Sequence, residues 1–141
     1  MASLDDPAVR EFLSAGTRTG KVAWVASDGA PHVAPIWFVL DGGDIVFNTG
    51  ADTGKGRALA REGRASLVVD EEAPPYSFVK VDGTVSLSDD LDEVRRFATT
   101  IGGRYMGEHR AEEFGARNGV PGELLVRLHP IRVVAGFDIA D

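Results

Sequence analysis

The sequence has 141 residues, a formal net charge of −7 and no cysteine. This length predicts a single domain over residues 1–141 with a substantial core, and the lack of cysteine excludes disulfides, zinc–thiolate sites and thiol catalysis. The excess of acidic residues argues against nucleic acid as a partner. No apolar run approaches the roughly 18 residues of a membrane span, and the first residues lack the features of a secretory signal. We therefore expect a cytoplasmic protein.

The first half of the chain predicts a short helix, three strands and a second helix. Asp6 is expected to cap the first helix, and Pro7 suits its first position. A three-stranded meander follows, with Asp-Gly turns between the strands. Its strands are expected at Lys21–Ser27, His32–Leu40 and Asp44–Thr49. A glycine-rich loop then opens the second helix, with Asp52 or Thr53 as its cap.

The second half predicts four strands and two helices. An amphipathic helix begins at Asp90, with Glu93 placed for a capping box, and a shorter one covers Ala111–Arg117. Strands are expected at Ala65–Asp70, at Tyr76–Leu87 with a bulge near Asp82-Gly83, and at Glu123–His129 and Ile131–Ile139 on either side of Pro130. No regular crossover helices separate the strands, so the fold class is mainly β (α+β), an antiparallel barrel with peripheral helices.

A glycine-rich loop between a strand and a helix start is the most informative stretch. It reads Asn48-Thr49-Gly50-Ala51-Asp52-Thr53-Gly54-Lys55-Gly56-Arg57. Free backbone N–H groups at a helix start favour an anion, and Lys55 and Arg57 can add charge-assisted hydrogen bonds to a phosphate. A solvated surface loop is the alternative. The nucleotide-binding P-loop is excluded, because one spacer residue is missing and Gly56 replaces the required Ser or Thr.

An apolar segment upstream of this loop could form the wall of a binding site. Pro35 lacks an N–H and is typical of a sheet edge or a bulge. Beside it, Trp37 and Phe38 offer large apolar faces that suit a flat heterocycle. Burial of both aromatics in the core is the alternative.

Other kinds of functional site have no support in the sequence. His32, His109 and His129 lack metal-ligand spacing, so we expect no metal site. There is no nucleophile elbow and no dinucleotide fingerprint. We therefore predict no catalytic side chain.

Several motifs, taken in order, resemble a known family. They are Gly-x-Pro-x-x-x-Pro-x-Trp-Phe (Gly29 to Phe38), Asn-Thr-Gly before Gly-Lys-Gly-Arg-Ala-Leu (Gly54–Leu59), Gly63–Asp70, Pro75–Thr84 and Arg-Tyr-Met-Gly (Arg104–Gly107). Over about residues 21–137 the chain resembles the pyridoxamine 5′-phosphate oxidase-like split β-barrel superfamily, in particular its short deazaflavin-dependent oxidoreductases of the B class. The resemblance implies a split β-barrel homodimer with cofactor sites at the subunit interface.

The resemblance also implies a cofactor and the residues that bind it. The cofactor would be the deazaflavin coenzyme F420, with FMN as the alternative. Asn48, Thr49, Lys55, Gly56 and Arg57 would hold its phosphate. Pro35, Ile36 and Trp37 would lie against the ring, and Tyr76 and Ser77 would line the site near the interface. Thr53 replaces a basic residue that some relatives carry in this loop.

The function implied is hydride transfer to a conjugated small-molecule acceptor such as an enone, quinone or tetrapyrrole. The cofactor would supply the chemistry and the protein the orientation. Two alternatives stay open, an FMN-dependent enzyme of the pyridoxamine-phosphate oxidase type and a non-catalytic protein that binds flavin or haem. Haem binding would require His32 or His129 as a ligand.

Overall fold

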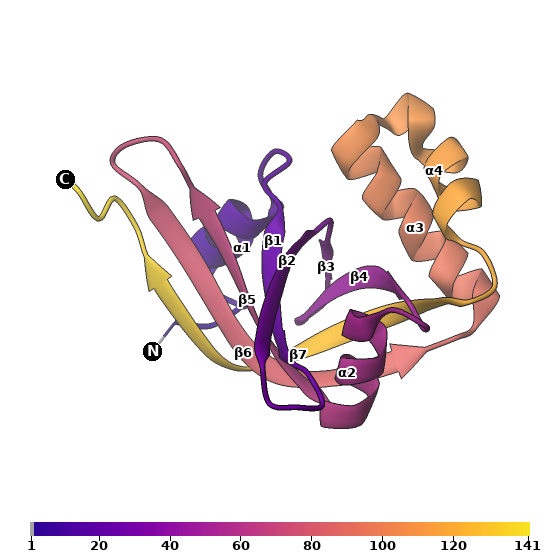
Figure 1. Cartoon of the computed structure of the whole chain (residues 1–141). Helices are drawn as coiled ribbons and strands as arrows, with labels where there is room; N and C mark the ends of the chain where they lie inside the picture. The colour runs from indigo at the N-terminus through magenta and orange to yellow at the C-terminus, as the bar shows by residue number, and fades with distance from the viewer. Residues whose placement is uncertain (1) are drawn as a thin grey trace.

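The computed structural model describes residues 2–141, which fold into a curled antiparallel sheet with helices around it (Figure 1). The helices are α1 (Pro7–Ser14), α2 (Gly54–Glu62), α3 (Leu91–Met106), α4 (Ala111–Asn118) and a 3-10 turn, η1 (Glu108–Arg110). The strands are β1 (Gly20–Val25), β2 (Pro31–Ile36), β3 (Val39–Asp41), β4 (Asp44–Gly50), β5 (Arg64–Glu71), β6 (Ser77–Ser88) and β7 (Glu123–Gly136). The predicted α+β class, antiparallel pairing and peripheral helices are confirmed.

The sheet stays open because, in residues 2–141, its two outermost strands do not pair with each other. The strand order is β2-β1-β5-β6-β7-β4-β3, which puts β2 and β3 at opposite edges. These two strands are nevertheless consecutive in the chain and are joined only by Trp37 and Phe38. The result is a split barrel whose two edges are linked through this dipeptide.

The prediction of one strand over His32–Leu40 is therefore wrong, and so is the three-stranded meander. The chain forms two separate hairpins, β1–β2 and β3–β4. Pro35 has no N–H to donate and lies near the end of β2, where the chain leaves β1 and crosses to β4. The expected turns at Gly29 and Gly42 are present, and both glycines have positive φ, 86° and 58°.

Strands β6 and β7 pair along most of their length around one bulge. Gly83 pairs with Pro130 and Asp82 with Arg132, which leaves Ile131 as the extra residue. The predicted irregularity near Asp82-Gly83 is confirmed. The prediction of two closing strands is wrong, because β7 continues through Pro130, whose missing N–H is tolerated at a bulge.

Helix starts follow the predicted caps only in part. The hydroxyl of Thr53 caps α2 by accepting from the Gly56 N–H (3.0 Å). Asp90 caps α3 by accepting from two N–H groups of its first turn. Asp6 lies at the start of α1 but makes no side-chain cap. Half of the expected capping box at Glu93 is present: the Glu93 N–H donates to Asp90 Oδ1 (3.3 Å), but the Glu93 carboxylate accepts from the Ser88 hydroxyl (3.2 Å) and not from the Asp90 N–H.

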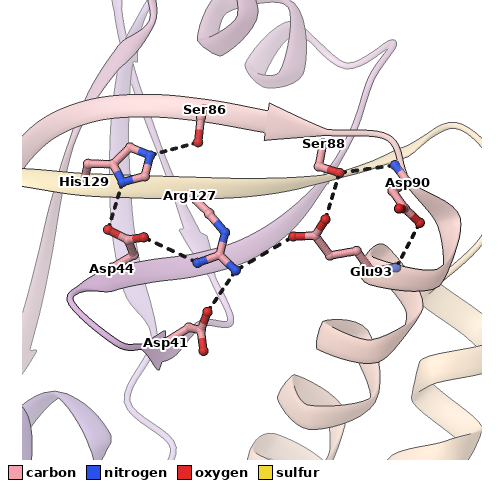
Figure 2. A network of polar contacts seen from close by, with 8 residues as sticks. All are labelled: Asp41, Asp44, Ser86, Ser88, Asp90, Glu93, Arg127 and His129. Carbon is pink, nitrogen blue, oxygen red and sulfur yellow. Dashed lines mark hydrogen bonds and ion pairs between the residues drawn. The ribbon is translucent and has the colours of Figure 1, made fainter.

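A charged network ties the start of α3 to the sheet (Figure 2). Arg127 on β7 lies within 2.8 Å of Asp41, 3.4 Å of Asp44 and 3.8 Å of Glu93. The four residues come from β3, β4, α3 and β7, so the network fixes the helix against the sheet edge.

Within residues 2–141 none of the helices has the length and apolar composition of a membrane span.

Two apolar cores result from this arrangement. The larger one fills the curled sheet and includes Phe38 and Phe47, both 0% exposed. The smaller one lies between β4 and α3 and includes Val46 and Phe97, with Trp37 packed at its margin. Trp37 and Phe38 are adjacent in the link between β2 and β3, yet their side chains pack in different cores.

Candidate functional site

A cavity of about 420 Å³ opens between the end of β2, β4, the start of α2 and the helices α3 and α4. Nine residues line it: Thr19, Pro35, Ile36, Trp37, Asn48, Lys55, Ile101, Asn118 and Glu123. Half of the ten residues expected to bind a cofactor are among them. The structure thus brings the predicted apolar wall and the predicted phosphate loop to one cavity.

The apolar wall is held rigidly by the helices behind it. The Trp37 ring stacks on Tyr105 with centroids 5.1 Å apart and an interplanar angle of 1°. The Tyr105 hydroxyl in turn accepts from the Phe38 N–H (3.3 Å) and donates to the Arg18 carbonyl (2.8 Å). An aromatic fixed on one face and lining a cavity suits stacking of a flat ring.

The polar end of the cavity contains two opposite charges. Lys55 lies in the first turn of α2, and Glu123 begins β7 in register with Gly50. Burial lowers the pKa of Lys55, an effect that the Glu123 carboxylate opposes. Burial likewise raises the pKa of Glu123, and Lys55 opposes that shift. The charged form of each group is therefore partly desolvated.

Two observations indicate that a polar group of a ligand fits this end. The buried Nδ2 of Asn48 has no hydrogen-bond partner among the described residues, and such a donor is costly unless something accepts from it. At Gly56 a Cβ atom would lie 2.1 Å from the Gly50 carbonyl oxygen, so only glycine allows the loop to fold this closely over the start of α2. Both features suit a phosphate-bearing ligand.

Thr49 and Arg57 do not line this cavity. Thr49 is buried and follows Asn48 on β4, so it points to the other face of the strand. Arg57 follows Lys55 by two positions on α2, and residues two apart do not share a helix face. Its exposed guanidinium donates to the Asp52 carbonyl instead.

Tyr76 immediately precedes β6 and Ser77 begins it. Neither residue is part of the cavity lining within one chain. Ser77 pairs with Glu71, whose carboxylate accepts from Arg18, the residue before the lining residue Thr19. Tyr76 is 42% exposed and has a positive φ of 63°.

Four lining residues, Thr19, Ile101, Asn118 and Glu123, were not among the residues expected to bind a cofactor. Ile101 is buried on α3, and the amphipathic pattern that predicts this helix does not indicate that it borders a site. Glu123 enters the cavity because β7 pairs with β4 in a register that places it opposite Gly50. That pairing joins residues 73 positions apart, and no local motif signals it.

None of the three histidines lines the cavity. His32 stacks on Trp24 with centroids 5.8 Å apart. His129 is hydrogen-bonded to Asp44 and to Ser86, at 2.8 Å each (Figure 2). Across residues 2–141, no group of three or more His, Cys, Asp or Glu is placed to hold a metal ion.

Comparison with solved structures identifies the fold. The conserved hypothetical protein Rv2991 from Mycobacterium tuberculosis matches with a TM-score of 0.81 and 20% identity over 93% of this chain and 83% of its own. A protein described as an F420 reductase matches with a TM-score of 0.71 and 23% identity over 88% and 94%. HutZ, the haem storage protein of Vibrio cholerae, matches with a TM-score of 0.73 and 21% identity over 99% and 100%.

These neighbours differ in the roles that their names give, and at such identities they establish the fold alone. A search of curated proteins gave no match. The family model described as pyridoxamine 5′-phosphate oxidase matches residues 5–135, which is nearly the whole chain. The chain therefore belongs to the pyridoxamine 5′-phosphate oxidase family.

Proposed function

We propose that this protein is a reductase that binds the deazaflavin coenzyme F420 in the cavity and transfers a hydride to a conjugated acceptor such as an enone, quinone or tetrapyrrole. The observation that carries the proposal is the lining of one cavity, which is apolar on one side and polar on the other. Its apolar side is Pro35, Ile36 and Trp37, and its polar side is Asn48 and Lys55. A flat ring bearing a phosphate needs both kinds of surface.

The residues of this chain bind and orient the ligand. Lys55 pairs with the phosphate, and Asn48 donates its free amide N–H to a ligand oxygen. Trp37, fixed by Tyr105, supports the ring and excludes water from one side. The bound cofactor supplies the hydride chemistry. Solvent protonates the product, so no side chain acts as an obligatory acid.

FMN is the second candidate for this cavity. Lys55 is the cation in the lining, and one cation can pair with the phosphate of either cofactor. Haem storage has less support, because the cavity lining contains no histidine. An FMN-dependent oxidase and a flavin or haem carrier thus remain the competing functions.

We further propose that the protein acts as a homodimer. The outer face of β1, β5, β6 and β7 has a largely apolar groove of about 510 Å³, lined by Trp24, Val25 and Ile131 among others. Ile131, at the bulge, is 72% exposed, and contiguous apolar surface of this kind marks interaction sites. In a dimer, Tyr76 and Ser77 of one subunit would line the cavity of the other.

Parallel titration of the pure protein with oxidised F420, FMN and haemin tests the proposal. We expect F420 to bind most tightly, followed by oxidation of the reduced coenzyme by a panel of quinones and enones. Preference for FMN would overturn the choice of cofactor. Tight binding of any of the three without turnover would overturn the assignment as an enzyme.

A further inference from the structure

The charged groups of the cavity do not sum to the positive charge that a phosphate site usually offers. Of the nine lining residues, Lys55 and Glu123 are the two that carry charge, and their charges are opposite. With both groups ionised the cavity is neutral. A carboxylate at the polar end of the cavity repels an anionic ligand, so Glu123 is unexpected in a phosphate site.

Glu123 does not neutralise Lys55 by direct contact. Among the described residues, no ion pair joins the two within 4.0 Å. The carboxylate instead lies against the phosphate loop, where a Cβ atom at Gly50 would be 3.2 Å from Glu123 Oε2. Both charges therefore face the same polar end of the cavity, with room between them.

Within the cavity, Lys55 is the other titratable group among the described lining residues, and Asp89 lies outside it, in a separate hollow that Glu123 also borders. From α2 the cavity presents Lys55, from β4 Asn48 and from α4 Asn118, and neither asparagine titrates. Burial already raises the pKa of Glu123 against the opposing effect of Lys55. An incoming anion acts in the same direction as burial, because it disfavours a nearby negative charge.

We propose that Glu123 selects the charge of the phosphoryl group that this cavity accepts, favouring a singly charged phosphodiester over a doubly charged phosphomonoester. The inference rests on the proposed binding of a phosphorylated flavin-type cofactor. A phosphodiester keeps one negative charge at all physiological pH values, whereas a monoester gains a second near pH 6. Lys55 offsets one charge, and Glu123 opposes the second.

This selection separates the two candidate cofactors by their phosphates and not by their rings. FMN carries a phosphomonoester, and the deazaflavin coenzyme carries its phosphate as a diester. A doubly charged group can enter only against the repulsion of Glu123 or with uptake of a proton by that carboxyl. Affinity for a monoester therefore falls as pH rises through the pKa of Glu123 in the free protein.

The test uses three ligands that share one ring: riboflavin, FMN and the methyl phosphodiester of FMN. Their dissociation constants are measured by fluorescence at pH 8 with the wild-type protein and with Glu123→Gln, which keeps the side-chain shape. We expect FMN to bind on the order of tenfold more tightly to the variant, because one like-charge repulsion is removed. The diester should change less, and riboflavin should not change.

A matched control and a second readout accompany this comparison. Glu112→Gln on the exposed side of α4 makes the same change of charge outside the cavity and should alter none of the three affinities. Calorimetry in buffers of different ionisation enthalpy reports proton uptake, since any uptake by the FMN phosphate itself persists in Glu123→Gln. The wild type should take up more protons than the variant on binding FMN.

The outcomes separate this inference from the proposed function. An unchanged ratio of FMN to diester affinity in Glu123→Gln, with unchanged proton uptake, would overturn the role of Glu123 while leaving the binding site intact. If neither F420 nor any of the three ligands binds the wild type, the proposed function fails and the inference fails with it. Should Glu123→Gln not fold, the wild type alone decides the question. Proton uptake on binding FMN beyond what the FMN phosphate itself can take up would support the role of Glu123, and the absence of such an excess would overturn it.

Discussion

At the scale of single residues, Lys55 and Arg57 are a matched pair of cations on one helix. Lys55 lines the cavity, whereas Arg57 bonds to the Asp52 carbonyl outside it. We expect Lys55→Ala to weaken binding of F420 or FMN by about 1.5–3 kcal/mol, the worth of a hydrogen bond to a charged group. Riboflavin binding should not change.

The control for this prediction is Arg57→Ala, which should change the affinity by about twofold or less, since the residue is exposed. Equal losses in both variants, measured by the same titration, would show that the Arg57 side chain turns into the cavity on binding. Both residues would then hold the phosphate, as the family resemblance implies.

Gly54 and Gly56, where the glycine-rich loop enters α2, give a second matched pair. A Cβ atom at Gly56 would lie 2.1 Å from the Gly50 carbonyl oxygen, whereas at Gly54 nothing lies within 4 Å. We expect Gly56→Ala to lower the free energy of unfolding by about 1–3 kcal/mol through overpacking. Gly54→Ala should raise it, by up to about 1 kcal/mol, because alanine favours the helix. Urea denaturation of both variants measures the difference, and equal effects would contradict it.

Glu123 should also affect stability in the absence of ligand. Its pKa in the folded protein is raised by burial, so between the unfolded and folded pKa values the folded state binds more protons than the unfolded state. Its contribution to stability is therefore lost as pH rises through that window. We expect Glu123→Gln to have a higher Tm than the wild type at pH 7, and the difference to vanish near pH 3.5, below the usual Glu pKa of about 4.3. A variant less stable at pH 7 would show that the charged form is favoured by the fold.

At the scale of elements, Arg104 holds three segments together. From α3 it donates to the carbonyls of Leu13 (2.7 Å) and Gly16 (3.0 Å) at the end of α1, and of Phe38 (2.7 Å) before β3. The last carbonyls of a helix lack partners within it, so this side chain completes α1. Arg104→Met keeps most of the apolar stem and should cost about 2–3 kcal/mol of unfolding free energy.

Arg110→Met is the control for that prediction, because Arg110, the last residue of η1, makes an exposed ion pair with Glu113 in the first turn of α4. Such pairs contribute about 0.5 kcal/mol or less. Chemical denaturation followed by circular dichroism compares the two variants. Similar losses of unfolding free energy in the two variants would mean that the contacts of Arg104 contribute no more to stability than a surface ion pair does.

The elements that could be predicted from sequence are those fixed by local patterns. The cap residues Thr53 and Asp90 predict the starts of α2 and α3. Glycines predict the hairpin turns, and strand composition predicts the strands that flank them. The division of His32–Leu40 between two sheet edges was missed because it depends on which distant strand each half meets. Continuity of β7 through Pro130 was missed for a similar reason, since the bulge requires its partner β6.

The same distinction applies to the candidate site. Its wall and its phosphate loop lie in motifs between Pro35 and Lys55, and these could be predicted. Its remaining lining comes from Thr19 before β1, from α3 and α4 and from the start of β7, which only the tertiary fold brings there. Thr49 and Arg57 were expected in the site because a motif does not reveal which of two neighbouring residues faces inward.

At the scale of the whole molecule, the apolar outer groove predicts how two copies associate. Ile131 is 72% exposed within the groove, whereas Ile139 is 59% exposed and does not line it. We expect a dimer in the wild type and a monomer in Ile131→Asp, because a charge buried at an interface lacks a partner. Ile139→Asp should remain dimeric. Light scattering coupled to size-exclusion chromatography measures the masses, and a monomeric wild type would refute the dimer.

Trp37 and Phe38 join the two edges of the split barrel, and their side chains enter separate cores. The cavity surface at Trp37 therefore takes its shape only when the barrel interior and the α3 packing have both formed. We therefore expect a ligand of this cavity to bind only a chain in which both cores have formed.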